Sequence, residues 1–173
     1  MADWGEAAGR IGSHVLSVCP RMLVMVEGVA ENTKHAGKGS GMLWGENLLE
    51  AGEHPVRLSN ASKLVYAPHT YGPSVYPEAQ FDDPAFPRNM DAIWDERFMY
   101  LADRGIAPVL IGEAGGRMWG PHTKEDGTFD KRSDRAWQEA LVRYLKKKGA
   151  SLFYHALLVP KAGGRQDTLG LLQ

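Results

Sequence analysis

The sequence of 173 residues lacks the features that mark several large classes of protein. Its single cysteine, Cys19, allows no disulfide within the chain. No apolar run approaches the roughly 20 residues of a transmembrane helix, and the opening Met-Ala-Asp-Trp-Gly-Glu has neither the basic nor the apolar region of a signal peptide. The net charge of −1 provides no basic surface, so we expect neither nucleic acid nor a membrane as partner.

What remains is the composition of an ordinary soluble globular protein, with 43% apolar and 24% charged residues. The length suffices for one domain with a sizeable core, and no linker or internal repeat interrupts residues 1–173, so we expect a single domain. Helical and extended patterns alternate, which predicts an α/β fold. We expect helices at about 3–19, 89–101 and 134–148, strands at 21–27, 64–67, 107–111 and 151–154, and loops at 37–45 and about 117–132.

Caps and apolar stripes define the expected helices further. Asp3 caps the first helix, whose inner side carries Ala7, Ala8, Ile11 and Val15, with Val18 as a further candidate. Asn89 caps the second helix, whose core stripe is Met90, Ile93, Trp94, Phe98 and Leu101. One face of the third helix is formed by Trp137, Leu141, Tyr144 and Leu145.

Glu113 is the most informative residue of the chain. It follows the apolar run Ala107–Ile111, which has the character of a buried strand, and two glycines come shortly after it. A carboxylate at the carboxyl end of a parallel strand lies where α/β barrels and doubly wound folds place their chemistry. The alternative is a Glu that caps the next helix or ends a strand in water.

A second polar group follows another expected strand. Residues 64–67 are extended, and His69 and Tyr71 come soon after them with Thr70 between. Because side chains alternate along an extended chain, His69 and Tyr71 point to the same side. A lone His after Pro is more often a loop residue whose hydrogen bonds are made locally. Together with Glu113, however, these residues favour a carboxylate site.

Several motifs in this order resemble the cellulase (endo-β-1,4-glucanase) branch of glycoside hydrolase family 5. The resemblance covers about residues 3–155 and lies in Asp3-Trp4 with Ala7-Ala8, residues 24–29, residues 64–76, residues 86–95 and residues 106–113. It implies a (β/α)8 TIM barrel. A complete barrel needs about 250 residues, so the chain is expected to form only its second half, strands five to eight.

The resemblance also implies roles. Glu113 is expected as the nucleophile of a retaining hydrolase of β-1,4-glucan, with Tyr71 hydrogen-bonded to it and His69 lining a sugar subsite. Retaining hydrolysis needs two carboxyl groups about 5–5.5 Å apart. The family's acid/base Glu belongs to an Asn-Glu-Pro motif, which is absent here. We therefore expect that the chain alone, without an upstream half, is inactive and exposes apolar surface that favours aggregation or dimerisation.

An aromatic residue, a second carboxylate and three histidines are further candidates for functional roles. Trp44 lies in a glycine-rich loop, where it either stacks on a glucosyl ring or packs over the core. Glu27 follows the expected strand 21–27 and is more readily a structural hydrogen-bonding group than a replacement acid. His35, His54 and His122 have no ligand-like spacing, so we expect no metal site. The family's chemistry requires no cofactor.

The C-terminal segment departs from the family. His155 stands where the resemblance expects a Trp that stacks under the sugar, and the following residues match the family pattern only in fragments. Two functions therefore stay open: a β-glucan hydrolase in its intact form, or a non-catalytic, carbohydrate-binding remnant. The resemblance implies secretion of the intact enzyme, whereas the localisation of this chain stays undecided.

Overall fold

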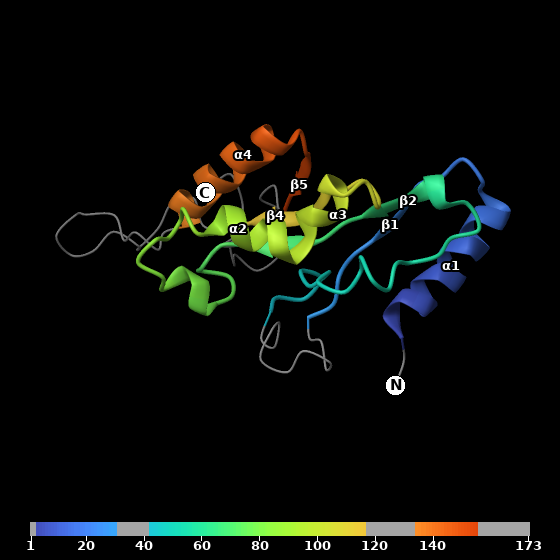
Figure 1. Cartoon of the computed structure of the whole chain (residues 1–173), viewed down its shortest axis with the longest axis horizontal. Coiled ribbons are helices and arrows are strands. Elements are labelled where there is room, and N and C mark those ends of the chain that lie inside the picture. The colour runs from blue at the N-terminus through green and yellow to red at the C-terminus, as the bar shows by residue number, and fades with distance from the viewer. Residues whose placement is uncertain (1–2, 31–41, 117–133, 156–173) are drawn as a thin grey trace, which may run out of the picture. The chain divides into compact units, whose positions relative to one another are not determined.

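A computed structural model describes residues 3–30, 42–116 and 134–155 (Figure 1). Residues 37–41 of the expected loop 37–45, the expected loop 117–132 and the divergent segment after His155 lie outside these residues, as do His35 and His122. Contacts divide the chain into two compact units. The first unit comprises residues 1–69 and 95–112, and the second comprises residues 70–94 and 113–173.

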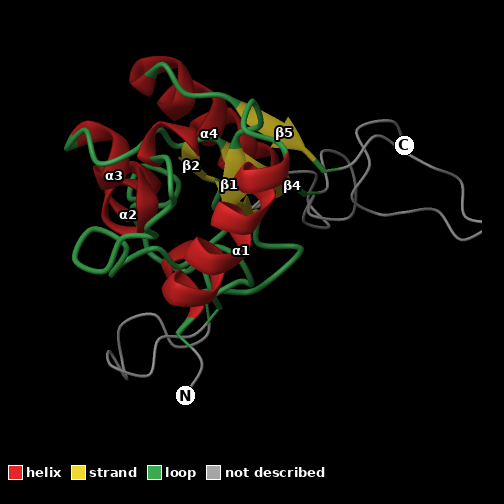
Figure 2. Cartoon of the chain, turned by 90° about the vertical axis from the view of Figure 1, so that its right-hand side faces the viewer, coloured by secondary structure: helices red, strands yellow, loops and turns green. Residues whose placement is uncertain are grey.

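The described residues contain both helices and short strands, drawn red and yellow in Figure 2. The elements are α1 (Trp4–Val18), β1 (Val24–Val26), η2 (Ala61–Lys63), β2 (Leu64–Tyr66), β3 (His69–Tyr71), η3 (Ala79–Phe81), α2 (Met90–Trp94), the π-helix η4 (Asp95–Met99), α3 (Tyr100–Asp103), β4 (Ile111–Gly115), α4 (Asp134–Lys148) and β5 (Leu152–Tyr154). Among the described residues, five short strands stand where the sequence predicted four, because His69–Tyr71 forms a strand of its own after the one expected at 64–67.

Helix α1 begins as expected, since the Asp3 side chain accepts a hydrogen bond of 3.0 Å from the backbone N–H of Glu6. Its buried face, however, differs from the expected one. The residues that face inward are Ala8, Gly9, Gly12 and Leu16, whereas Ile11, Val15 and Val18 are exposed. The expected inner side was therefore wrong for Ile11 and Val15, and Val18, the further candidate, is exposed as well.

Two glycines explain this rotation of α1. A Cβ on Gly9 would lie 2.8 Å from the carbonyl oxygen of Arg57, and one on Gly12 would lie 2.6 Å from the Leu58 side chain. The helix thus turns its smallest residues toward the chain that it packs on, because only glycine permits so close an approach. The spacing of the apolar residues along the helix could not reveal this contact.

Strands β1 and β2 of the first unit pair in parallel, with Val24 opposite Leu64 and Val26 opposite Tyr66. Residues 107–110 continue this arrangement, since Val109 forms a parallel bridge with Tyr66. The regular strand β4 begins only at Ile111, so the expected strand 107–111 was placed too early. Glu113 consequently lies within β4 and not directly after it.

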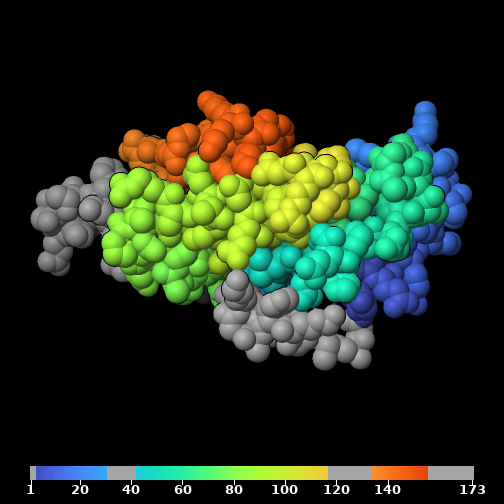
Figure 3. Space-filling model, in the orientation of Figure 1, coloured from blue at the N-terminus to red at the C-terminus, as the bar shows by residue number. Residues whose placement is uncertain are grey.

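In the second sheet, β4 lies between β3 and β5. The backbone N–H of Gly72 donates to Gly115 O (3.1 Å), and that of His155 donates to Ala114 O (2.8 Å). Within the second unit α4 packs against α2, where the Trp94 ring meets the rings of Trp137 and Tyr144. Figure 3 shows the orange atoms of α4 directly against the light-green segment that contains α2.

The helix expected from Asn89 is divided. It consists of α2, a π-helical turn and α3, although Met90, Trp94, Phe98 and Leu101 are buried as expected. Ile93 is only half-buried. Asn89 does not cap the helix through its side-chain oxygen, since its amide donates to Gln80 O and its Oδ1 has no partner. The π-turn adds a residue to the helical cycle and brings Arg97 and Met99 inward as well.

Candidate active site

The second unit brings the two expected partners of the carboxylate site together. The hydroxyl group of Tyr71 donates a hydrogen bond of 2.6 Å to Oε2 of Glu113. This distance lies within the range for a hydroxyl group that donates to a carboxylate. The expected geometry is confirmed, while the catalytic roles remain a proposal.

Local structure explains why Tyr71 can reach Glu113. The neighbouring strands β3 and β4 carry these residues, and Tyr71 is only 5% exposed. Thr70, the preceding residue, accepts a hydrogen bond of 3.3 Å from the indole N–H of Trp94. Because successive side chains of a strand alternate, this anchor of Thr70 directs Tyr71 to the opposite face.

His155 also belongs to this part of the second unit. Its ring lies edge-on to that of Tyr71, with centroids 6.4 Å apart and an interplanar angle of 80°. The residue that replaces the family's expected Trp therefore supports the phenol from the side. Edge-to-face packing favours this orientation of two aromatic rings.

The first unit contains a second pair of a carboxylate and a ring. Nε2 of His69 lies 3.2 Å from Oε2 of Glu27, and the His69 side chain is 11% exposed against 47% for Glu27. This contact favours the structural role expected for Glu27 over that of a replacement acid. A hydrogen on Nε2 points toward the carboxylate, which orients the imidazole ring.

Gly45 closes over the His69 ring. It has φ +79°, and a Cβ there would lie 2.7 Å from the imidazole ring atoms Cγ and Nδ1. The carbonyl oxygen of Gly45 accepts hydrogen bonds from the backbone N–H groups of His69 and Gly28. A glycine is required here by both the left-handed backbone and the close approach.

The residue before Gly45, Trp44, is 55% exposed. The residue after it, Glu46, is buried and forms an ion pair of 2.9 Å with Arg97 of the π-turn. The segment that carries Trp44 is thus anchored from the protein interior while the indole ring faces outward. Of the two roles weighed for Trp44, this exposure favours surface stacking over core packing.

Burial raises the pKa of Tyr154 at the end of β5, although the hydrogen bond to Gln138 partly opposes this change and the Asp134 charge adds to it. The Tyr154 hydroxyl is therefore neutral at physiological pH. It donates to the carbonyl oxygen of Gly116 at 3.2 Å. The end of β4 thus receives a donor from β5.

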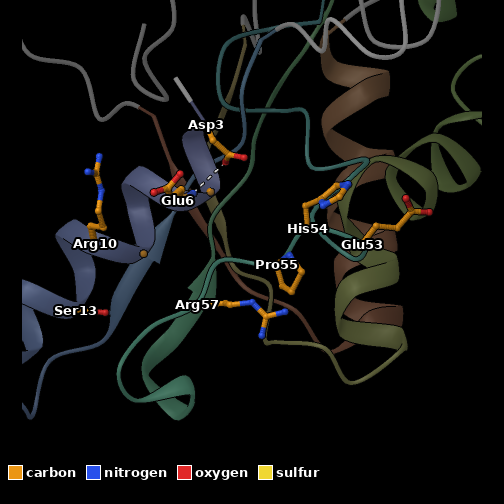
Figure 4. A pocket seen from close by; sticks show the side chains of 10 residues that line it. Asp3, Glu6, Arg10, Ser13, Glu53, His54, Pro55 and Arg57 are labelled. Carbon is orange, nitrogen blue, oxygen red and sulfur yellow. Dashed lines mark hydrogen bonds between the residues drawn. The ribbon is translucent and has the colours of Figure 1, made fainter. Parts of the chain in front are cut away.

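No group of three or more His, Cys, Asp or Glu among the described residues could hold a metal ion. A hollow of about 580 Å³ lies in the first unit between α1 and residues 53–57. Figure 4 shows that charged side chains of both signs line it, among them Glu6, Arg10 and Arg57. None of the four expected site residues borders this hollow.

Comparison with known proteins identifies the family. The family model described as cellulase (glycosyl hydrolase family 5) matches residues 1–158. The chain belongs to this family. Its fold is accordingly of the TIM-barrel type, and the described residues form part of it, an α/β arrangement with parallel strands.

The chain is similar to an endoglucanase of Paenibacillus polymyxa, with 42% identity over 98% of this chain and 39% of the relative. It is 39% identical to the major extracellular endoglucanase of Xanthomonas campestris pv. campestris, over 99% of this chain and 32% of the relative. The chain therefore spans about a third to two fifths of these proteins.

Solved structures agree with this assignment. The catalytic domain of the Xanthomonas campestris enzyme superimposes with a TM-score of 0.78 and 37% identity, over 99% of this chain and 45% of that domain. An endocellulase of Pyrococcus horikoshii, solved as a complex with cellotetraose, gives a TM-score of 0.79 and 37% identity, with 99% and 44% covered. Within the described residues, no helix is long and apolar enough to cross a membrane.

Proposed function

We propose that this chain carries the nucleophile of a retaining glycoside hydrolase that cleaves β-1,4-glucan. The observation that carries the proposal is the hydrogen bond of 2.6 Å from Tyr71 to Glu113 in a chain of the cellulase family. The endoglucanase names of the relatives and the cellotetraose bound to the Pyrococcus horikoshii enzyme support the choice of substrate.

In the proposed reaction Glu113 attacks the anomeric carbon of a glucosyl unit through one carboxylate oxygen. A general acid protonates the glycosidic oxygen as its bond to that carbon breaks, and a glycosyl ester on Glu113 results. The same acid group, now a base, removes a proton from water, which attacks the anomeric carbon and releases Glu113. The hydrogen bond from Tyr71 holds the attacking carboxylate in position.

The chain has no Asn-Glu-Pro motif, so we propose that the general acid comes from a part of the protein outside these 173 residues. The described residues would then correspond to strands five to eight of the barrel. His69 lines a sugar subsite in this proposal, and the exposed Trp44 stacks on a glucosyl ring. The intact enzyme is secreted, as the name of the Xanthomonas campestris relative supports.

The test compares the chain alone with the chain joined to an upstream half that supplies the acid. We expect background hydrolysis of soluble cellulose from the chain alone, because a missing general acid costs about 10²–10⁴-fold. Turnover should return in the joined protein and disappear in its Glu113→Gln variant. Binding of cello-oligosaccharides without turnover in the joined protein would instead favour the carbohydrate-binding remnant.

A further inference from the structure

The strongest unexplained group outside the proposed site is the buried carboxylate of Asp134. This residue begins α4 in the second unit and is 0% exposed. A carboxylate at the first turn of a helix ordinarily faces solvent and serves the helix itself. Asp134 instead accepts hydrogen bonds from the loop that follows β3: its Oδ1 from the backbone N–H of Ser74 at 2.9 Å, and its Oδ2 from the Ser74 hydroxyl group.

Two glycines bring the ends of both site strands against Asp134. A Cβ on Gly72, directly after Tyr71, would lie 2.4 Å from Oδ1 of Asp134. A Cβ on Gly116, directly after β4, would lie 2.9 Å from Oδ2 of Asp134. Only residues without a side chain permit this contact, so the carboxylate lies directly between the two strand ends.

The same strand ends are bonded to each other and to α4. Gly72 donates its backbone N–H to Gly115 O (3.1 Å). The side-chain amide of Gln138, one turn after Asp134 in α4, donates to Gly116 O (3.2 Å). The first turns of α4 thus fix the backbone immediately after Tyr71 and three residues after Glu113.

We propose that Asp134 is a positioning residue, which holds the ends of β3 and β4 in the register that brings the Tyr71 hydroxyl group onto Glu113. In this proposal Asp134 acts through Ser74, Gly72 and Gly116. Its importance for catalysis rests on the proposed function, whereas its effect on the Tyr71–Glu113 hydrogen bond does not.

The first measurement needs no activity. In the protein joined to an acid-bearing half and labelled with ¹³Cζ-tyrosine, the Tyr71 resonance is assigned by its loss in Tyr71→Phe, and Glu113→Gln gives its position when the carboxylate acceptor is removed. We expect Asp134→Asn to move the resonance toward that position, because one of the hydrogen bonds between residue 134 and Ser74 is lost or reversed. Glu139→Gln, which changes an exposed carboxylate of the same helix, should leave it in place.

Ser74→Ala provides a milder second variant, which removes the hydroxyl donor and keeps Asp134. It should move the Tyr71 resonance in the same direction, and it keeps the test decisive if Asp134→Asn does not fold. An unchanged Tyr71 resonance in the folded variants would overturn the proposal, whatever the enzyme's activity.

The second measurement separates positioning from a merely structural role. In the protein joined to an acid-bearing half, 2,4-dinitrophenyl 2-deoxy-2-fluoro-β-cellobioside should trap Glu113. Its carboxylate forms an ester with the anomeric carbon, and dinitrophenolate leaves with the electron pair of the broken bond, so no acid is needed. Asp134→Asn should lower the trapping rate at saturating probe by about 10-fold or more with unchanged probe affinity, since small misplacements are costly.

A lower stability with an unchanged trapping rate per folded molecule would mark a structural role and overturn the proposal. Failure of the unmodified protein to be trapped would count against the proposed function alone, because the Tyr71 resonance reports on positioning independently.

Discussion

Among the described residues, Glu113 and Glu27 each lie against the polar atom of an aromatic ring side chain, and the two pairs are built differently. Glu113 accepts from a phenol that is 5% exposed, at 2.6 Å. Glu27 lies 3.2 Å from His69, and its own side chain is 47% exposed. In the first pair the buried Tyr71 hydroxyl group orients the Glu113 carboxylate. In the second pair the Glu27 carboxylate orients the His69 ring, which Gly45 also contacts closely. The difference supports the proposal that Glu113 is the nucleophile and that Glu27 has a supporting role.

The largest expected effect separates these two carboxylates directly. In the protein joined to an acid-bearing half, Glu113→Gln should lower kcat by on the order of 10⁴-fold, since the nucleophile is lost. Glu27→Gln keeps a hydrogen-bond acceptor for His69 and should cost about 10-fold at most, a loss of orientation alone. Initial rates on soluble cellulose measure both. Equal losses of kcat in the two variants would contradict the different roles of the two carboxylates and would indicate that Glu27 acts as the general acid.

The second prediction concerns the anchor of the segment over His69. Replacing Arg97 by Met leaves the buried Glu46 without its ion-pair partner and should lower the free energy of unfolding by about 3–5 kcal/mol. Arg135→Met breaks an exposed pair with Glu139 and should change it by about 0.5 kcal/mol at most. Urea unfolding followed by circular dichroism measures both. Similar losses would mean that the buried pair contributes no more than a surface one.

Gly45 offers a smaller and more local test. Gly45→Ala places a Cβ 2.7 Å from the His69 ring at φ +79° and should destabilise the fold by about 2–3 kcal/mol. Gly105→Ala has a similar φ of +66° but nothing within 4 Å of the added Cβ, so it incurs the backbone strain alone, about 1 kcal/mol. The difference in urea midpoints isolates the contact with the imidazole ring. Equal midpoints would show that the ring moves aside without cost.

The smallest effect is a dependence on alkaline pH. Burial raises the pKa of Tyr66 above its ordinary value of 10.0, although the N–H of Val56 donates to its oxygen and partly offsets this. The neutral phenol is therefore favoured in the folded state. Its stabilising contribution is fully present below pH 10 and is lost as the pH rises through the raised pKa.

Urea unfolding between pH 8 and pH 11.5 tests this sign. The free energy of unfolding should fall above about pH 10, and the fall should be smaller in Tyr66→Phe. A steeper fall in the Phe variant would contradict the direction of the shift. Tyr100 and Tyr154 have raised pKa values as well, so part of the fall remains in that variant.

The sequence predicted well what depends on local pattern. The Asp3 cap, the buried face of α4 and the pairing of Tyr71 with Glu113 follow from spacing along single elements and from the family resemblance. What it missed depends on contacts between elements. The inward turn of Gly9 and Gly12 in α1 and the π-turn that buries Arg97 belong to these.

Sequence reasoning missed the buried position of Asp134 for the same reason, because it depends on contacts between elements. Asp134 was expected only as the start of a helix, because its burial results from the approach of Gly72 and Gly116, which lie far from it in the sequence. A glycine directly after each of two neighbouring strands was the one available signal. Such glycines indicate a close neighbour without identifying it.

The most direct test of the central claim locates the covalent glycosyl ester. The protein joined to an acid-bearing half is incubated with 2,4-dinitrophenyl 2-deoxy-2-fluoro-β-cellobioside, digested, and analysed by tandem mass spectrometry. We expect one fluorocellobiosyl group on the peptide that contains Glu113, placed on Glu113 itself, and no label in Glu113→Gln. A label on another carboxylate, or active enzyme that is never labelled, would contradict the assignment of Glu113 as the nucleophile.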